Sequence, residues 1–478
     1  MLAYILSILE LFRPCFSRNT SFAWFSSIVL GLMLRTDRLG VTSIVRDLSL
    51  CPASYHSLLH FFHSDAWDLA AMRRCWYRAI LRYIPICREA DAFLLAADGV
   101  KQSKEARRMP GVKRMHQESE TQTKAESIFG HMWGCIGILA GLPGRLACIP
   151  ASLRLHDGLR EAAGWEDSDA SDESHVVQII RNAYEVAREL AGNAILAMDC
   201  YFLSVPALVA WKEERSKGGF SLELVTRARK SCTAYHAPPP RKPGQKGRPR
   251  RKGDSVKLWS LFDSMRDSFV PARVEMYGKL TDISYYCIDL LWGLKLYHPL
   301  RFVLVKDGPS RTILASTSRD LTPTAIIRIY SYRFRIEHTF RELKQQVGGF
   351  AYRFWSKSLE KLSHFQKKTA PSPLERATDA GARRNILRTV RAIEMYAIAS
   401  SVAMGIVQAI SLKYADDLSG CLRWQRTPCR TRPSEANVMH YLRRAFCAVW
   451  AKPSKNSILR FIQQHQTEPY EDADSWVA

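Results

Sequence analysis

The chain has 478 residues and carries 69 Lys and Arg against 46 Asp and Glu, a formal net charge of +23. Apolar residues make up 47% and charged residues 24%, which is the composition of a globular protein and excludes a disordered, collagen-like or disulfide-stapled chain. A chain of this length predicts about two to four domains, and a charge this basic predicts a polyanionic partner.

The cysteines and the apolar segments argue against export and against a membrane span. None of the twelve cysteines forms a C-x-x-C pair, so no zinc ribbon or redox motif is expected, and scattered thiols are typical of a reducing cytosol. The start, Met1–Phe12, lacks the basic residues of a signal peptide. The apolar run Phe22–Leu34 is shorter than the roughly 20 residues that cross a bilayer and predicts a buried helix.

Residues 1–88 are predicted to be helical. Two short periodic segments, Val41–Leu48 and Ala53–Phe62, are separated by a turn, and Thr42 and Ser54 are placed to cap them. Such a pair suggests a helix-turn-helix-like unit that contacts DNA. Any helical bundle contains similar pairs, so a purely structural role is the alternative.

From residue 90 the pattern changes to short apolar runs, two of which end at an acid. The run Ala92–Ala97 precedes Asp98, and the run Ala194–Met198 precedes Asp199, as in buried strands. The remaining periodicity predicts strands at 130–140, 148–155 and 221–226 and helices at 176–190 and 204–215. This order predicts a mixed α/β layer.

A basic segment follows this layer. Residues 224–253 contain ten Lys or Arg and no acid, and Arg241–Lys252 is rich in Pro and Gly, which predicts a flexible loop. Its Gly247-Arg248-Pro249-Arg250 core resembles an AT-hook, whose arginines enter a narrow A·T minor groove. The alternative is a basic loop, including Arg251, that binds only phosphates.

The next segments predict β structure and then long helices. β-like runs at 258–261, 272–277, 283–291, 302–305 and 312–315 indicate an all-β subdomain inserted into the α/β layer. One long helix is expected over 322–347. A polar linker, 356–382, precedes a second long helix over 386–412, expected to be core or a dimer surface, and a tail that is helical after Pro433.

The first long helix carries a polar edge. At 100° per residue, four residues spaced Y-x2-R-x3-E-x6-K fall within an arc of about 60°: Tyr330, Arg333, Glu337 and Lys344. The simple interpretation is a solvated helix with i,i+4 ion pairs, each worth about 0.3–0.5 kcal/mol.

Two strand-end acids favour a second interpretation. Asp98 and Asp199 follow strands of one layer, and acids at strand ends of one sheet can converge. A hairpin turn at Asp98 and a helix N-cap at Asp199 are the alternatives. Together with Glu337, in a chain of charge +23, these acids predict a site in which two Mg²⁺ ions neutralise the carboxylates and polarise a phosphodiester.

The Y-x2-R-x3-E-x6-K element resembles the signature of a large group of bacterial insertion-sequence transposases. Further segments resemble it too: LLAADGVKQSKEARRMPGVKRMHQESETQTK, ILAMDCYFLSVPAL and GRPRRKGDSVKL. The resemblance covers about residues 20–450. It implies an RNase H-like core, a β-rich insertion between the second and third acids, and a DDE triad of Asp98, Asp199 and Glu337.

The resemblance also implies an activity. Such enzymes bind the inverted repeats at the element ends as a dimer, cleave one strand, close a hairpin with the freed 3′-OH, reopen it and join the end to target DNA. The implied cofactor is a pair of Mg²⁺ ions, for which Mn²⁺ substitutes. The implied location is the bacterial cytoplasm at the nucleoid, with no membrane. Tyr330, Arg333 and Lys344 are then expected to hold phosphates.

The expected division is 1–88 helical and DNA-binding, 89–232 the first part of the core, 233–320 the basic loop and β-rich insertion, 321–355 the last core helix, and 356–478 a helical dimerisation region. Arg227, Arg229 and Lys230 follow the last core strand, where they contact DNA or only solvent. Trp292, with Trp259 as a second candidate, is expected to stack on a flipped base or to be core. His131 and Trp133 are expected only to pack.

Two other functions remain compatible with the sequence. One is a catalytically inactive DNA-binding regulator derived from a transposase, against which the intact acids argue. The other is a DDE-type nuclease without strand transfer. Short inverted repeats around the gene would distinguish a transposase from both.

Overall fold

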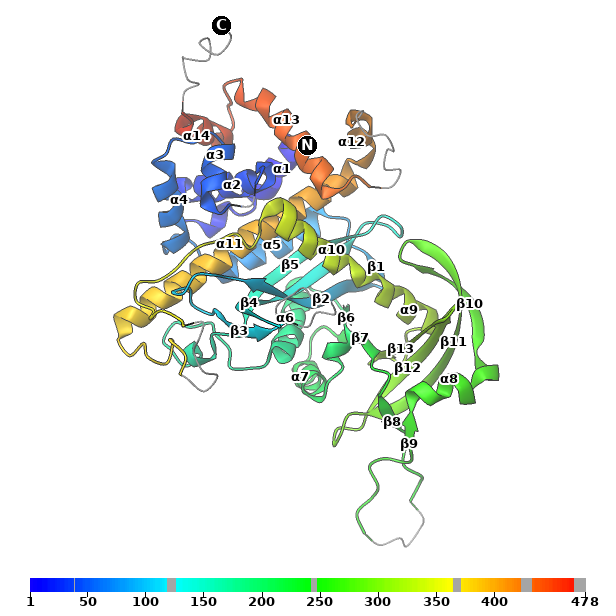
Figure 1. Cartoon of the computed structure of the whole chain (residues 1–478). Coiled ribbons are helices and arrows are strands. Elements are labelled where there is room, and N and C mark those ends of the chain that lie inside the picture. Colours follow the sequence, from blue (N-terminus) through cyan, green and yellow to red (C-terminus); the bar gives the residue numbers. More distant parts are fainter. Residues whose placement is uncertain (38, 118–125, 242–246, 364–370, 423–431, 468–478) are drawn as a thin grey trace.

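The protein was studied as a computed structural model, which describes residues 1–37, 39–117, 126–241, 247–363, 371–422 and 432–467 (Figure 1). The described residues form one large mixed sheet with helices on both faces and helical regions at both ends of the chain. The predicted mixed α/β class is therefore confirmed.

The N-terminal region is helical as predicted. Its helices are α1 (Leu2–Glu10), α2 (Asn19–Leu34), α3 (Val41–Asp47), α4 (Ser54–His63) and α5 (Leu69–Tyr83), with a 3₁₀ turn, η1 (Arg13–Cys15), after α1. The predicted caps are wrong. α3 and α4 start after Gly40 and Ala53 with no side-chain capping bond, because Thr42 and Ser54 already lie inside the first turn.

The strands of the sheet all lie between Arg88 and Ser316. The described strands are β1 (Arg88–Glu89), β2 (Ala92–Ser103), β3 (Lys113–His116), β4 (Ser127–Ala140), β5 (Ala147–His156), β6 (Ala194–Met198), β7 (Leu222–Ala228), β8 (Thr233–Tyr235), β9 (Ser255–Lys257), β10 (Val270–Met276), β11 (Lys279–Trp292), β12 (His298–Asp307) and β13 (Ser310–Ser316).

The central strands have the order β5-β4-β2-β6-β7. β2, β6 and β7 are mutually parallel, whereas β4 and β5 run antiparallel to their neighbours. Helices α6 (His175–Glu189) and α7 (Val205–Ser216) connect β5 to β6 and β6 to β7. This arrangement is compatible with the RNase H-like core that the resemblance implies.

The insertion extends this sheet instead of forming a separate β layer. β13 pairs antiparallel with β7, from Ser316 opposite Val225 to Ile313 opposite Ala228, so β10–β13 continue the central strands into a curved extension (Figure 1). The predicted strand at 258–261 is wrong, since Leu258–Ser260 is a 3₁₀ turn (η4) that leads into α8 (Leu261–Ser264) and η5 (Arg266–Ser268).

The predicted long helix over 322–347 is interrupted. It consists of α9 (Pro323–Tyr332), α10 (Phe334–Glu342) and a π-helical turn, η6 (Leu343–Val347). At the junction, Arg333 N–H donates to the Tyr330 carbonyl at 3.1 Å and Ile336 N–H to the Arg333 carbonyl at 3.0 Å, so the backbone tightens to i,i+3 bonds there. The uniform 100° spacing assumed from the sequence therefore does not hold.

The helix α11 (Ala380–Lys413) lies between the sheet and the N-terminal helices (Figure 1). It is the one described helix long and apolar enough to cross a membrane, yet 94% of its apolar window is buried inside the protein. It starts six residues before the predicted boundary, and it packs on β5, α2, α4 and α5, as a core helix does.

The two ends of the chain meet. The C-terminal helices are α12 (Ala415–Cys421), α13 (Glu435–Trp450) and α14 (Ser457–His465), and both α13 and α14 contact α2. The Cys51 N–H also donates to the His465 carbonyl at 2.7 Å. Helices from 1–88 and from the C-terminal region thus form one packed group on top of α11 (Figure 1).

Candidate active site

Asp98 and Asp199 lie side by side because of the register of two parallel strands. β2 pairs with β6 up to Ala96 opposite Ala197, and each acid follows two residues later. Side chains two residues apart share one face of a strand, so both carboxylates leave the sheet on the same side. Beyond this point β6 ends, whereas β2 continues along β4 to Ser103.

This geometry corrects part of the sequence interpretation. Asp98 lies within β2 and not at its end, and the alternative of a hairpin turn at Asp98 is wrong for the same reason. Asp199 does follow its strand and precedes a 3₁₀ turn, η3 (Cys200–Phe202), but its carboxylate makes no capping bond there. The Asp199 carboxylate therefore does not serve as a helix cap.

The third acid reaches Asp98 through an arginine. Arg333 Nη1 lies 3.3 Å from Asp98 Oδ2, and Arg333 Nη2 donates to Glu337 Oε1 at 2.6 Å. The Arg333 side chain is only 13% exposed, whereas that of Glu337 is 44% exposed. Residues 239 positions apart in sequence, Asp98 and Glu337, are thus bridged by one guanidinium.

The three acids act on one another electrostatically. Burial, together with the negative charges of Asp199 and Glu337, raises the pKa of Asp98 to about 6, although Arg333 and the Gly99 N–H, 2.7 Å from Oδ1, oppose the shift. A carboxyl with a raised pKa between two other carboxyls is a feature of sites that bind cations or move protons.

The donor chemistry at this point fits a hard divalent cation. Carboxylate oxygens are the ligands that Mg²⁺ and Mn²⁺ prefer, and Asp98 itself pairs with Arg333. Among the described residues, no set of three or more His, Cys, Asp or Glu side chains is already clustered around one point as a metal cage. Arg333 separates the Asp98 and Glu337 carboxylates in this structure, which accounts for their spacing.

Three predicted phosphate-binding residues line a cavity near Asp199. Arg227 Nη2 lies 3.8 Å from Asp199 Oδ1, and Arg227, Tyr330 and Arg333 line one cavity of about 320 Å³. Two exposed aromatic side chains that the sequence interpretation missed, Tyr277 and Phe334, line the same cavity, with ring centroids 6.3 Å apart.

The other predicted DNA-contacting residues have neighbours other than the three acids. Lys344 Nζ donates to the Lys101 carbonyl of β2 at 3.5 Å. Arg229 and Lys230 follow β7, and the Lys230 amine lies 5.0 Å from the centre of the Trp259 ring. Trp292 ends β11, partly buried against the core.

Arg248, Arg250 and Arg251 lie in the connection between β8 and β9, at the edge of the molecule opposite the terminal helices (Figure 1). Arg251 lies 5.7 Å from the centre of the Tyr297 ring. Part of the predicted basic loop, 242–246, is outside the described residues.

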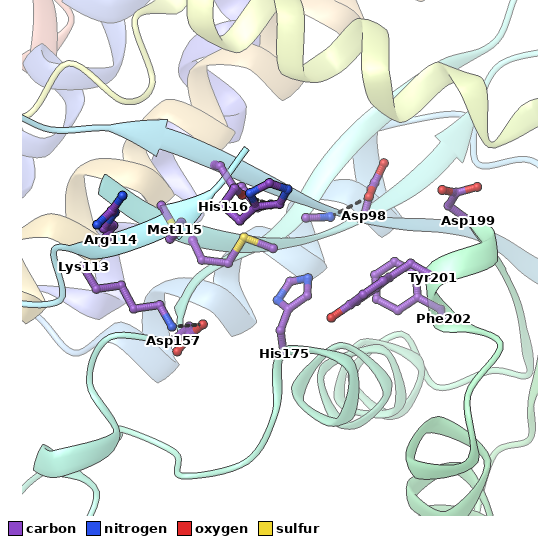
Figure 2. Close-up of a pocket in the computed structure, with 13 residues that line it drawn as sticks. Asp98, Lys113, Arg114, Met115, His116, Asp157, His175, Asp199, Tyr201 and Phe202 are labelled. Carbon is purple, nitrogen blue, oxygen red and sulfur yellow. Dashed lines mark hydrogen bonds and ion pairs between the residues drawn. The ribbon is translucent and has the colours of Figure 1, made fainter. Parts of the chain in front are cut away.

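Asp98 and Asp199 themselves line a second cavity (Figure 2). It has a volume of about 430 Å³ and Asp98 and Asp199 lie at one end of it. Its remaining lining comes mostly from β3, from the start of α6 and from η3, and includes the following: Lys101, Lys113, Arg114, His116, His175 and Tyr201. Sequence reasoning assigned none of these residues to the site.

Comparison with known families shows which families the chain matches. A family model described as a DDE superfamily endonuclease matches residues 11–264, a little over half of the 478 residues, and one described as a transposase DDE domain matches residues 174–362. The first range includes Asp98 and Asp199 and the second includes Asp199 and Glu337. No curated protein matches the chain.

Proposed function

Because the chain belongs to the DDE superfamily endonucleases, we propose that it is a DNA transposase of the cut-and-paste type. It binds the terminal inverted repeats of its own insertion sequence, uses Asp98, Asp199 and Glu337 to cut the DNA, and joins the 3′-OH ends to target DNA. The observation that supports this most directly is that Asp98, in register beside Asp199, is bridged to Glu337 by Arg333.

The proposed catalytic residues hold two divalent cations. When bound, Mg²⁺ or Mn²⁺ neutralises the three carboxylates and polarises the phosphodiester and the attacking oxygen. Asp98 sits deepest and contributes a carboxylate whose ionisation is opposed by its neighbours, so cation binding favours its charged form. Glu337 is the most exposed of the three and faces the incoming DNA.

Cationic side chains beside the acids hold the phosphates. Arg227 and Arg333 each offer a planar fork of donors that matches phosphate oxygens, and Tyr330 adds a hydroxyl in the same cavity. Tyr277 and Phe334 supply the aromatic surface there, so we propose that a flipped base stacks on them. Trp292 stays a prediction for this role.

One site suffices for all steps. Strand cleavage, hairpin closure by the freed 3′-OH, hairpin opening and attack on target DNA are each phosphoryl transfers, for which positioning and charge neutralisation are the main demands. A homodimer brings two element ends together. We assign end binding to residues 1–88 and to Lys344 and the basic residues after β7, and dimer contacts to the C-terminal helices.

Replacing Glu337 by Gln tests the assignment. Glu337→Gln keeps the side-chain size but removes the charge, so nicking in Mg²⁺ of a supercoiled plasmid that carries the gene with its native flanks should fall at least about 100-fold, or 2.7 kcal/mol in barrier. Binding of the same DNA should be unchanged or slightly tighter, because one repulsion with phosphate is gone.

Glu342→Gln is the matched control. Glu342 lies on the same helix, but it is buried, its Oε1 accepts from Arg341 Nε at 3.0 Å, and it faces Glu435 instead of Asp98. It should retain cleavage. Normal cleavage by both variants would refute the DDE assignment, and nicking without joined products in the wild type would favour a nuclease without strand transfer.

A further inference from the structure

The cavity of Figure 2 has a cationic side whose charge is only partly neutralised. Lys113 forms an ion pair with Asp157. Lys101 and Arg114, in contrast, bond to neutral oxygens: Lys101 Nζ donates to the His116 carbonyl at 2.7 Å and Arg114 Nε to Ser127 Oγ at 2.9 Å. Apart from Asp98 and Asp199 at its end, the lining therefore carries excess positive charge that suits an anionic backbone.

An aromatic residue lies on the same cavity beside the second acid. Tyr201 follows Asp199 by two residues, and its side chain is 51% exposed. It meets the buried Phe202 edge-on at 5.5 Å, and Phe202 in turn packs against the His175 ring at 5.9 Å. Tyr201 is thus a half-exposed ring fixed at its base by buried neighbours, as expected of a stacking platform and not of a core tyrosine.

The floor of the cavity holds a buried polar atom that the protein leaves without a partner. Asn182 Nδ2 donates to His156 Nε2 at 2.9 Å, so His156 must donate through Nδ1 to His175 Nδ1, also at 2.9 Å. His175, which is only 8% exposed, consequently carries its hydrogen on Nε2, and this atom has no hydrogen-bond partner. It lies beside Gly99, next to Asp98, and is closed off from solvent behind the cavity lining.

The size and the lining of the cavity select one class of ligand. A volume of about 430 Å³ accommodates one or two nucleotides, but a duplex is far too wide to enter. Paired bases also hide their faces in the stack, whereas a single strand exposes them to an aromatic ring. A cationic side opposite an aromatic platform is the combination by which proteins hold single strands with little sequence preference.

We propose that this cavity, the strand groove, holds a single strand of DNA directly next to the phosphate that is cut. Tyr201 stacks on a base, and Lys101, Lys113 and Arg114 contact the backbone. The groove rests on the proposed function, since it includes Asp98 and Asp199 of the same site. It would separate the strands at the cut, as hairpin formation requires.

Binding of a fluorescent dT12 strand and of a 12-base-pair duplex tests the groove, in the Glu337→Gln background so that no DNA is cut. The background variant should bind the strand, and Tyr201→Ala should weaken this binding about five- to one-hundredfold, whereas Tyr201→Phe keeps the ring and should bind normally. A 2-aminopurine in the strand should lose fluorescence on binding and regain it in Tyr201→Ala.

Charge variants provide the second readout. Lys113→Gln with Arg114→Gln should lower the salt dependence of dT12 binding by up to about 0.7 per lost phosphate contact. Lys452→Gln with Lys455→Gln, exposed residues next to α14, remove the same charge and should not lower it. Wild-type dT12 affinity in both Tyr201→Ala and the Lys113 and Arg114 variant would overturn the groove. Cleavage by Glu337→Gln is scored separately and bears only on the proposed function.

Discussion

Asp98 carries an electrostatic cost in the folded protein. Burial and the charges of Asp199 and Glu337 raise its pKa to about 6 from the ordinary value of 3.8, although Arg333 opposes them. A raised pKa means that the folded chain holds a proton more tightly than the unfolded chain does. Ionised Asp98 therefore destabilises the fold near pH 7, and protonation relieves this cost as the pH falls below 6.

Asp98→Asn should consequently stabilise the protein while abolishing cleavage. The shift from 3.8 to about 6 corresponds to about 2–3 kcal/mol at about 1.4 kcal/mol per pKa unit, so the thermal midpoint without divalent metal should rise in Asp98→Asn. Mg²⁺ should raise the midpoint of the wild type more than that of the variant, because only the wild type keeps all three carboxylates.

Asp157→Asn serves as the comparison for this prediction. The Asp157 side chain is 43% exposed and pairs with Lys113, so its replacement should change stability by less than about 1 kcal/mol. If Asp98→Asn proves less stable than wild type, the carboxylate is held by favourable contacts, and the crowding of charge inferred here is wrong.

The sequence predicted the proximity of these acids better than their local geometry. Asp199 was recognisable because a short, fully buried strand ends just before it. Asp98 was placed at a strand end because pairing with β4, which extends β2 to Ser103, is a long-range interaction that local periodicity does not encode. Tyr201 and Lys113 gave no signal, since exposed aromatic and basic residues acquire meaning only when the fold brings them to a cavity.

At the scale of elements, the segment after η6 is docked onto the sheet by a buried hydrogen-bond chain. Trp133 Nε1 donates to Tyr352 Oη at 3.1 Å, Tyr352 donates to His131 Nδ1 at 2.7 Å, and His131 Nε2 donates to the Pro110 carbonyl at 2.8 Å. The Lys104 amine adds a bond to the Tyr352 carbonyl at 3.0 Å. His131 and Trp133 thus have the packing role that the sequence suggested, and they fix the segment that follows Glu337 and Lys344.

This docking should weaken in acid. Burial, helped by the nearby Lys104, lowers the pKa of His131 to about 3, and burial lowers that of His175 to about 4. In the unfolded chain these histidines bind a proton near the ordinary pKa of 6.5. The contribution of the two neutral histidines to stability is therefore complete above that pH and is lost as the pH falls from 6.5 toward 4. At pH 5 each histidine costs about 2 kcal/mol, which thermal unfolding at pH 7 and pH 5 should detect.

His131→Gln identifies the contribution of the docking chain. The glutamine has no proton to gain, so the difference between pH 7 and pH 5 should shrink by about 2 kcal/mol, whatever the variant's stability at pH 7. An unchanged difference would show that burial and the charge of Lys104 do not hold His131 neutral.

Element boundaries followed from the sequence where patterns are local. The helix α6 and the strands β4 to β6 appear within a few residues of their predicted positions, because buried periodic segments bounded by polar turns define them. The interruption at Arg333 was not predictable, since neither Pro nor Gly marks it, and the tightening there serves the side chain that bridges Asp98 and Glu337. The pairing of β13 with β7 also lay beyond local pattern.

For the molecule as a whole, positive charge and the position of the basic segment define how DNA is approached. The net charge of +23 creates a long-range attraction for a polyanion, which salt screens. The segment between β8 and β9 projects from the sheet at the end opposite the terminal helices (Figure 1).

DNA affinity should accordingly fall steeply with salt, and Arg248, Arg250 and Arg251 should account for part of the slope. Each lost phosphate contact on duplex DNA lowers the slope of log K against log salt by about 0.9, so replacing all three by Gln should reduce it by up to about 2.7. Lys452, Lys455 and Arg460 are exposed at the opposite end, and their replacement by Gln removes equal charge and should leave the slope nearly unchanged.

Fluorescence anisotropy with A·T-rich and G·C-rich duplexes separates the two interpretations of Gly247–Arg250. An equal loss on both duplexes indicates phosphate binding, because the backbone is the same in each, whereas a larger loss on the A·T-rich duplex indicates arginines inside a narrow minor groove. A DNA affinity that does not change with salt concentration would contradict a phosphate-dominated interface and, with it, the role proposed for the positive charge.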